Sequence, residues 1–114
     1  MITGFHGLVY TSEPEAVRAI FRDVFGWEHV DAGDGWLIFK LPPAELGVHP
    51  AKPGHAREFS LMCEDVEATI ADLRAKGIEF AGEPEDVGYG IAVTMLLPGG
   101  AELTLYEPRH ETAI

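Results

Sequence analysis

Two histidines and two glutamates stand in or directly beside short apolar segments of this chain: His6, His49, Glu58 and Glu102. Imidazole and carboxylate side chains can bind divalent metals and can move protons during a reaction. A carboxylate among apolar residues also needs a metal, a cation or water, because burying it without a partner is costly. These residues are therefore the first candidates for chemistry, provided that the fold brings them together.

Three of the four candidates also have an ordinary structural interpretation, whereas Glu58 has no simple role in a core. His6 can be a partly buried, hydrogen-bonded histidine, and His49 can close a strand just before Pro50. Glu102 can face solvent at the start of a strand. The other histidines have no pattern around them and receive no role: His29, His55 and His110.

The segments that carry the candidates belong to an internal duplication. Residues 5–27 are repeated at 58–78, and residues 41–50 are repeated at 98–108. The matched pairs include His6 with Glu58, Ala16 with Ala68, Arg22 with Arg74, Gly47 with Thr104 and His49 with Tyr106. Because the starts and the ends match in the same order, duplication is favoured over chance similarity.

Length and composition limit what this duplication can form. A chain of 114 residues is too short for two independent domains, so the two halves must share one core. The 19 acidic and 8 basic residues give a net charge of −11, which repels nucleic acid and anionic lipid. Such a surface suits a cationic ligand, although an ordinary acidic surface is the plainer interpretation.

Two further features concern the compartment. Cys63 is the only cysteine, which excludes an internal disulfide, and its apolar neighbours indicate a buried, inert thiol. No apolar run approaches the roughly 20 residues of a membrane span, and the start lacks the basic and apolar regions of a signal peptide. We therefore expect a cytoplasmic protein with neither membrane nor nucleic acid as a partner.

The first half predicts a strand, a helix and three more strands. Residues 4–11 are rich in β-branched and aromatic residues, and the helix that follows is capped by Ser12, has Pro14 in its first turn and ends at Gly26. The later strands are expected at 28–30, 36–41 and 44–49. Residues 50–56 are the expected linker.

The second half repeats that order. A strand at 58–63 precedes a helix that Asp65 caps and Gly77 ends. Strands are expected at 78–82, 91–97 and 102–107, with 83–90 as an acidic loop or irregular strand and a loose tail after 108. The prediction is one domain over 1–114, with units at about 1–50 and 57–108.

Two strand-helix-strand-strand-strand units in this order resemble the glyoxalase, bleomycin-resistance and extradiol-dioxygenase superfamily, also called the vicinal oxygen chelate fold. The resemblance covers nearly the whole chain. It rests on His6 with an acidic residue seven positions later, Val24-Phe-Gly-Trp, the Glu-Asp-Val-Glu-Ala run from Glu64, and Leu97-Pro-Gly-Gly. It implies an α+β fold in which two βαβββ modules form a curved mixed sheet, or cup, with the helices outside.

The resemblance also implies one divalent cation in the cup, held by the first and last strands of each module. The matching positions are His6, Glu58, Thr104 and Gly47, so Thr104 and Gly47 depart from the usual ligands. Because side chains alternate along a strand, Glu102 and His49 share the faces of these two residues, roughly 7 Å along. The implied ligands are then His6, His49, Glu58 and Glu102, a set that suits Fe, Mn, Co, Ni or Zn.

Two functions of different classes follow from the resemblance. One is a metal-dependent lyase, isomerase or dioxygenase for a substrate with adjacent oxygens, in which the metal is a Lewis acid and Glu58 or Glu102 moves the proton. The other is a metal-free protein that sequesters a cationic antibiotic. The imidazoles and Glu58 favour the enzyme, whereas the altered ligand pattern and the acidity favour binding. A third role on the same fold stays open.

The expected pocket and assembly complete the prediction. Flat or apolar ligands would contact Tyr10, Trp36, Met62, Thr104 and Tyr106, although the apolar members of this set can equally be core. Members of the superfamily commonly dimerise, and uncovered sheet edges invite a partner, so we expect a homodimer. Whether the units pair within one chain or between two stays open.

Overall fold

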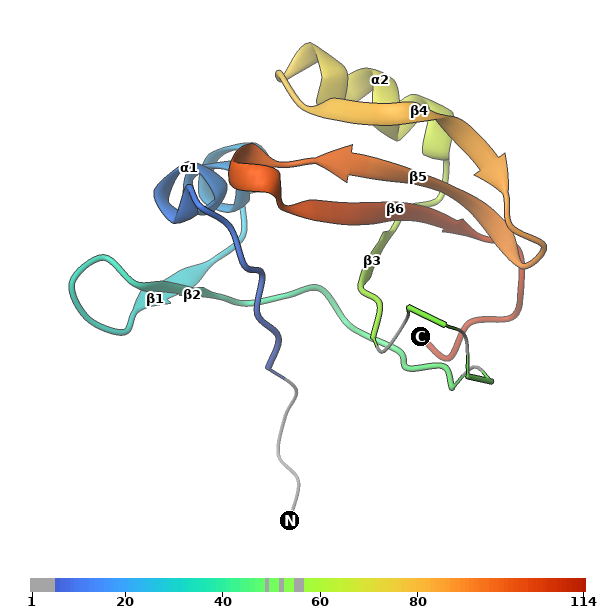
Figure 1. Cartoon of the computed structure of the whole chain (residues 1–114), viewed down its shortest axis with the longest axis horizontal. Helices are drawn as coiled ribbons and strands as arrows, with labels where there is room; N and C mark the ends of the chain where they lie inside the picture. The colour runs from blue at the N-terminus through green and yellow to red at the C-terminus, as the bar shows by residue number, and fades with distance from the viewer. Residues whose placement is uncertain (1–5, 49, 52, 55–56) are drawn as a thin grey trace.

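A computed structural model describes residues 6–48, 50–51, 53–54 and 57–114 (Figure 1). The helical segments are α1 (Pro14–Ala19), its π-helical continuation η1 (Ile20–Val24), α2 (Val66–Ala75) and the 3₁₀ turn η2 (Pro98–Gly100). The strands are β1 (His29–Asp31), β2 (Leu37–Phe39), β3 (Ser60–Met62), β4 (Glu79–Asp86), β5 (Gly90–Leu96) and β6 (Glu102–Pro108). The fold is therefore of the α+β class, as predicted.

The second half of the chain forms one four-stranded sheet in the order β3-β6-β5-β4. β3 runs parallel to β6, and the other pairs are antiparallel. The helix of this half begins where Asp65 accepts a hydrogen bond from the amide of Ala68 (3.0 Å), and Gly77 follows its end at a φ of 90°. Together these elements make the βαβββ unit that was predicted here.

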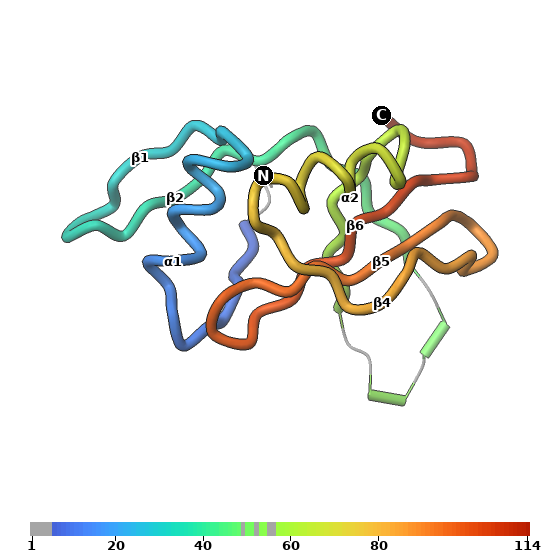
Figure 2. Tube along the Cα trace, turned by 90° about the horizontal axis from the view of Figure 1, so that it is seen from above, coloured from blue at the N-terminus to red at the C-terminus, as the bar shows by residue number. Residues whose placement is uncertain are grey.

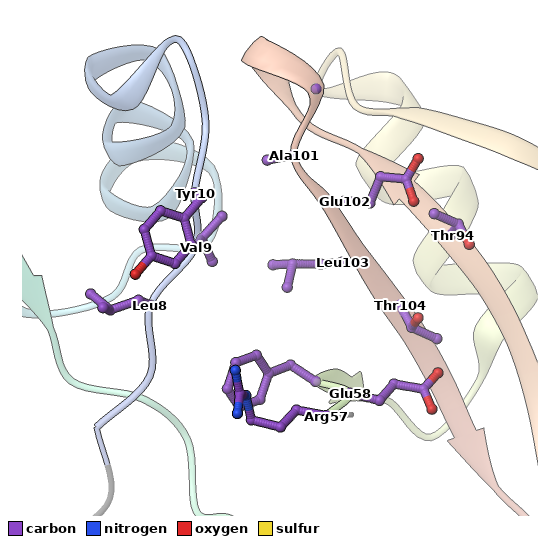
Figure 3. A pocket seen from close by; sticks show the side chains of 12 residues that line it. Leu8, Val9, Tyr10, Arg57, Glu58, Thr94, Ala101, Glu102, Leu103 and Thr104 are labelled. Atoms are coloured by element: carbon purple, nitrogen blue, oxygen red, sulfur yellow. The ribbon is translucent and has the colours of Figure 1, made fainter. Parts of the chain in front are cut away.

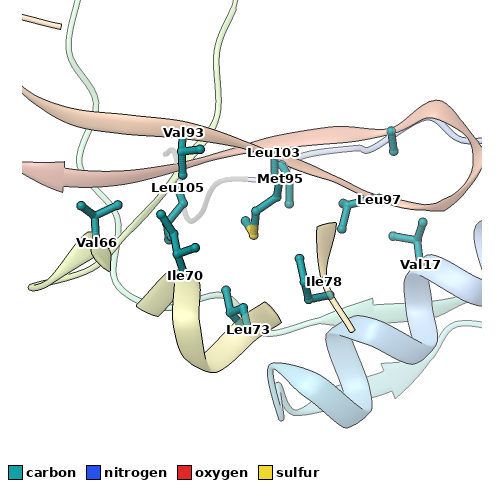
Figure 4. Close-up of a cluster of buried hydrophobic side chains, with 11 residues drawn as sticks. Val17, Val66, Ile70, Leu73, Ile78, Val93, Met95, Leu97, Leu103 and Leu105 are labelled. Atoms are coloured by element: carbon teal, nitrogen blue, oxygen red, sulfur yellow. The ribbon is translucent and has the colours of Figure 1, made fainter. Parts of the chain in front are cut away.

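The hydrophobic core lies between α2 and one face of this sheet (Figure 4). The helix contributes Val66, Ile70 and Leu73, and the strands contribute Val93, Met95, Leu103 and Leu105. Met95 has no exposed surface. Since burying such a side chain stabilises the fold by about 1.5–3 kcal/mol, this layer holds the second half together. The alternate residues of β5 and β6 face the other way, toward the open face of the sheet.

The first half forms the helical segment α1–η1 and a two-stranded hairpin. Val17 of α1 reaches the core, and an aromatic cluster joins the helical segment to the hairpin through Phe21, Phe25, Trp27 and Phe39. In the hairpin, β1 pairs antiparallel with β2. Figure 2 shows this hairpin at the opposite end of the molecule from the turn between β4 and β5.

Two predicted strands are not formed in the first half. Residues 6–11 and 44–48, the described parts of the predicted strands 4–11 and 44–49, belong to neither sheet. A strand is stabilised by cross-strand pairs, and neither segment has a neighbour in a ladder. Leu46 and Val48 are accordingly 82% and 95% exposed.

Three smaller predictions concern the ends of the elements, and the first of them is wrong. The N-cap position of α1 is Glu13, while the amide of Ser12 donates to the carbonyl of Gly99 (3.2 Å). β4 extends to Asp86 through a change of register between Ala81 and Glu85, so most of residues 83–90 forms the irregular strand that was one of the two expectations. The tail after residue 108 forms neither helix nor strand, although the amide of Ala113 donates to the side chain of Glu45 (2.8 Å).

None of the helices in the described part of the chain has the length and apolar character needed to cross a membrane.

Candidate functional site

A pocket of about 410 Å³ lies between residues 8–10 and the N-terminal part of β6 (Figure 3). At this level no described strand pairs with one side of β6, because β3 begins to pair with it only at Thr104. The lining residues are Leu8, Val9, Tyr10, Arg57, Glu58, Phe59, Thr94, Gly100, Ala101, Glu102, Leu103 and Thr104. The pocket therefore occupies the place where a further strand would close the sheet.

The pocket has an apolar side and a polar side. In Figure 3, Leu103 points across the gap toward Leu8 and Val9. Glu58, Glu102, Thr94 and Thr104 project together on the other side of β6. Thr94 and Thr104 are direct partners in the β5–β6 ladder, so their hydroxyls are neighbours on one face. The arrangement offers carboxylates and hydroxyls beside an apolar gap.

The two carboxylates are available to a ligand. Glu58 and Glu102 are both solvent-exposed, and neither makes an ion pair with another residue that the structure describes. The ladder between β3 and β6 begins only at Ser60 and Thr104, and Figure 3 shows Thr104 between the levels of Glu102 and Glu58 along β6. Two negative charges that line one pocket attract a cation.

The structure brings together some of the predicted site residues. Glu58, Glu102, Tyr10 and Thr104 line the pocket, whereas His6 does not. His49 falls outside the residues that the structure describes. Within 6–48, 50–51, 53–54 and 57–114, no group of three histidine, cysteine or acidic side chains is placed to hold a metal ion. The donors in the described part of one chain thus do not complete the metal site, and the ligand set stays a prediction.

Three predicted pocket residues lie elsewhere. Trp36 follows the turn of the hairpin, with the guanidinium carbon of Arg18 5.2 Å from its ring centre. Met62 ends β3, partly exposed. Tyr106 is only 9% exposed, and its ring packs against Tyr89. Burial, reinforced by the neighbouring Tyr89 and Glu45, raises the pKa of the Tyr106 hydroxyl.

The sequence analysis missed two polar residues of the pocket, Thr94 and Arg57. Thr94 is the single polar residue in the apolar run 91–97, and its position opposite the last strand was the available signal. Arg57 directly precedes Glu58, and Figure 3 shows its guanidinium on the side of the pocket opposite the two carboxylates. Cys63 is half-buried, and burial raises the pKa of its thiol, in agreement with an unreactive side chain.

The sequence and the fold are both similar to those of known proteins. The model of the Glyoxalase/Bleomycin resistance protein/Dioxygenase superfamily matches residues 5–110. An antibiotic-binding protein, TnmS3 of Streptomyces sp. CB03234, has a similar structure with a TM-score of 0.66 at 23% identity, covering 95% of this chain and 98% of its own.

Two other solved structures are similar to the same degree. A lactoylglutathione lyase from Agrobacterium tumefaciens has a TM-score of 0.66 at 19% identity, with 94% of each chain covered. A superfamily member from Sphaerobacter thermophilus DSM 20745 has a TM-score of 0.66 at 23% identity, covering 93% of this chain and 98% of its own. No curated protein matches the sequence. At these identities the similar structures establish the fold alone.

Proposed function

The chain belongs to the Glyoxalase/Bleomycin resistance protein/Dioxygenase superfamily, and from that premise we propose that it binds a cationic small molecule with an apolar body. The observation that carries the proposal is the pair Glu58 and Glu102, exposed and without an ion-pair partner among the described residues, beside an apolar gap. The antibiotic-binding protein among the similar structures supports a role of this kind.

In this proposal the charges determine which ligands are selected, and apolar contact provides most of the affinity. An exposed ion pair contributes only about 0–1 kcal/mol, so the two glutamates select the sign of the ligand more than they set its affinity. Apolar contact contributes about 25 cal/mol for each Å² that is buried, and Leu8 and Phe59, 51% and 42% exposed, offer such surface. The ligand is therefore a cation with a substantial apolar part.

Calorimetric titration with ethidium, a flat cation, tests this function. Ethidium should bind, while 8-anilinonaphthalene-1-sulfonate, an anion of comparable apolar character, should not. In the double variant Glu58→Gln, Glu102→Gln the affinity should fall roughly five- to thirtyfold, since each exposed pair contributes about 0.5–1 kcal/mol. Metal-free bleomycin, titrated in the same way, extends the test to an antibiotic.

A matched control is provided by Glu67, an exposed glutamate in the first turn of α2. Glu67→Gln removes one negative charge, as Glu58→Gln or Glu102→Gln alone does, from the helix that packs on the other face of the sheet, and should leave ethidium affinity unchanged. Equal loss in this control and in the single variants Glu58→Gln and Glu102→Gln would show that only the net charge matters, and would contradict a site at Glu58 and Glu102.

A metal-dependent enzyme is the second candidate, favoured by one observation. Glu58 and Glu102, two of the four predicted ligands, line the same pocket. Elemental analysis after dialysis against a mild chelator and reloading with Fe, Mn, Co, Ni or Zn tests it. Near-stoichiometric uptake that falls in Glu58→Gln, His6→Ala and His49→Ala would support this candidate, whereas no uptake of any of these metals would contradict it.

We also propose that the protein is a homodimer. Leu46, Val48 and Tyr10 are each more than four-fifths exposed, and a partner would cover such apolar side chains. Sedimentation equilibrium should then give twice the 12.4 kDa of one chain. A monomer throughout the micromolar range would contradict this.

A further inference from the structure

Tyr106 shares a face of β6 with Glu102 and Thr104, which line the pocket, because side chains alternate along the strand. Its ring should therefore continue the polar side of the pocket along β6. Yet Tyr106 is only 9% exposed and does not line the pocket. Other parts of the chain therefore cover Tyr106, which is the next residue after Thr104 on this face of β6.

Two aromatic side chains supply this cover. The ring of Tyr89, from the turn between β4 and β5, packs edge-on against Tyr106 at 5.8 Å between centres. The imidazole of His110, from the C-terminal tail, stacks on Tyr106 at 5.9 Å and 25°. The hydroxyl of Tyr106 donates to the carbonyl oxygen of Tyr89 (3.1 Å), which fixes the plane of the ring. One flat group therefore already stacks on Tyr106.

The position of the Tyr106 ring against β5, here called its seat, depends on a glycine. A Cβ atom at Gly90 would clash with the Tyr106 ring and would lie 2.5 Å from the carbonyl oxygen of Glu107. Only a residue without a side chain therefore lets the ring lie against β5 at this point. The position of Tyr106 is set by β5, β6 and the Tyr89 carbonyl, and it does not need the tail.

The tail itself is held weakly. Residues 109–114 are here called the C-terminal strap. Arg109 is held by two contacts, the hydrogen bond from its amide to the Tyr89 carbonyl (2.9 Å) and the ion pair of its side chain with Glu107 of β6 (3.0 Å). Among the described residues, one hydrogen bond ties residues 110–114 to another segment, from the amide of Ala113 to Glu45 (2.8 Å). His110 and Ala113 are exposed and Glu45 is only partly buried, so water competes for the contacts of residues 110–114. The strap can leave at low cost while the seat of Tyr106 remains.

We propose that the Tyr106 ring is a stacking subsite for a flat aromatic group of the ligand, and that the C-terminal strap fills it with His110 until the ligand displaces it. This inference rests on the proposed binding function, since it extends the same pocket along β6. Tyr106 lies one pleat repeat, roughly 7 Å, beyond Thr104. The ligand thus carries its ring about that distance from the group held near Thr104 and Glu102.

The state of the strap can be measured without any ligand. In the background Tyr10→Phe, Tyr89→Phe, Tyr106 is the sole tyrosine, because the chain has three. Absorbance at 295 nm then follows its ionisation alone. Burial holds the pKa of Tyr106 above the ordinary value of about 10. Removing the cover should therefore lower its pKa toward that value.

Three changes are compared in this background. His110→Ala removes the stacked ring, and a chain ending at Arg109 removes the rest of the strap. Both should lower the pKa of Tyr106, whereas Glu111→Gln, which changes a strap side chain without a described contact, should leave it unchanged. Circular dichroism checks that each variant is folded. An identical pKa of Tyr106 in all variants would contradict the claim that the strap covers Tyr106.

Ligand titration then separates this inference from the proposed function. Shortening the chain at Arg109 should raise ethidium affinity roughly two- to tenfold, because the ring of ethidium no longer competes with His110. Affinity for tetrabutylammonium, a cation without a flat ring, should not change. Tyr106→Leu should lower the affinity for ethidium and leave the affinity for tetrabutylammonium unchanged.

The failures are distinguishable. If ethidium binds through Glu58 and Glu102 but is indifferent to the strap and to Tyr106→Leu, the stacking subsite is wrong and the binding function stands. If the pKa of Tyr106 falls on shortening but neither cation binds the wild type or the shortened chain, the binding function fails and the subsite fails with it, leaving only the strap contact.

Discussion

The two halves of the chain carry one sequence pattern and reach different structures. In the second half, Leu103 and Leu105 of β6 are 8% and 2% exposed. Their repeat partners in the first half, Leu46 and Val48, are 82% and 95% exposed. An alternating apolar pattern therefore shows which side chains a strand could bury, but the elements that pack beside the segment determine whether these side chains are buried.

The neighbours differ in a specific way. α2 has 10 residues and covers the sheet of its own half, with Val66, Ile70 and Leu73 buried. α1 has 6 residues, continues as a π-helical turn and buries only Val17. The aromatic side chains of η1 pack toward the hairpin instead. The pocket lies where no described strand of the first half covers the start of β6.

The largest expected difference is in the cost of removing an apolar side chain. Leu103→Ala should reduce the free energy of unfolding by about 2–5 kcal/mol, because it leaves a cavity in the core. Leu46→Ala, its counterpart in the first half, should change it by no more than about 0.5 kcal/mol. Urea unfolding measures both, and a cost of several kcal/mol for Leu46→Ala would show that the first half is packed in solution.

Two glycines give the next contrast. Gly90→Ala places a methyl group against Tyr106 and should cost about 1–3 kcal/mol. Gly47→Ala in the first half meets no atom within 4 Å and should be neutral or slightly stabilising. Thermal unfolding compares the two variants, and a loss at Gly47 would mean that residues 44–48 are packed.

The helix starts give the smallest contrast. Asp65→Ala removes the side chain that caps α2 and should cost about 0.5–2 kcal/mol. Ser12→Ala should cost less than about 0.5 kcal/mol, because the Ser12 side chain does not cap α1. Chemical unfolding measures both, and equal costs would indicate that Ser12 caps the helix in solution as the sequence predicted.

The sequence was most informative where signals are local. Asp65, Gly77 and the apolar stripe of α2 predict that helix without reference to any other segment, and the turn at 98–100 is equally local. The strands at 6–11 and 44–48 depended on pairing, which residue types do not encode. These two segments do not form strands because no neighbour pairs with them, whereas β6 forms because β3 and β5 lie beside it.

The candidate site shows the same division. The repeat and strand alternation led to Glu58, Glu102, Tyr10 and Thr104, and all four line the pocket. The cover over Tyr106 could not be predicted, because the contact of Ala113 with Glu45 joins residues 68 positions apart with no shared pattern. The metal ligands stay a prediction for the same reason, since they require long-range placement of histidines.

The most direct test of the binding function is a backbone amide NMR titration of the wild-type protein with ethidium. We predict that the largest shifts fall on Thr94, Glu102 and Thr104, with little change in the β1–β2 hairpin. Shifts centred on the hairpin, or no saturable shifts at all, would contradict a small-molecule site on the second half of the chain.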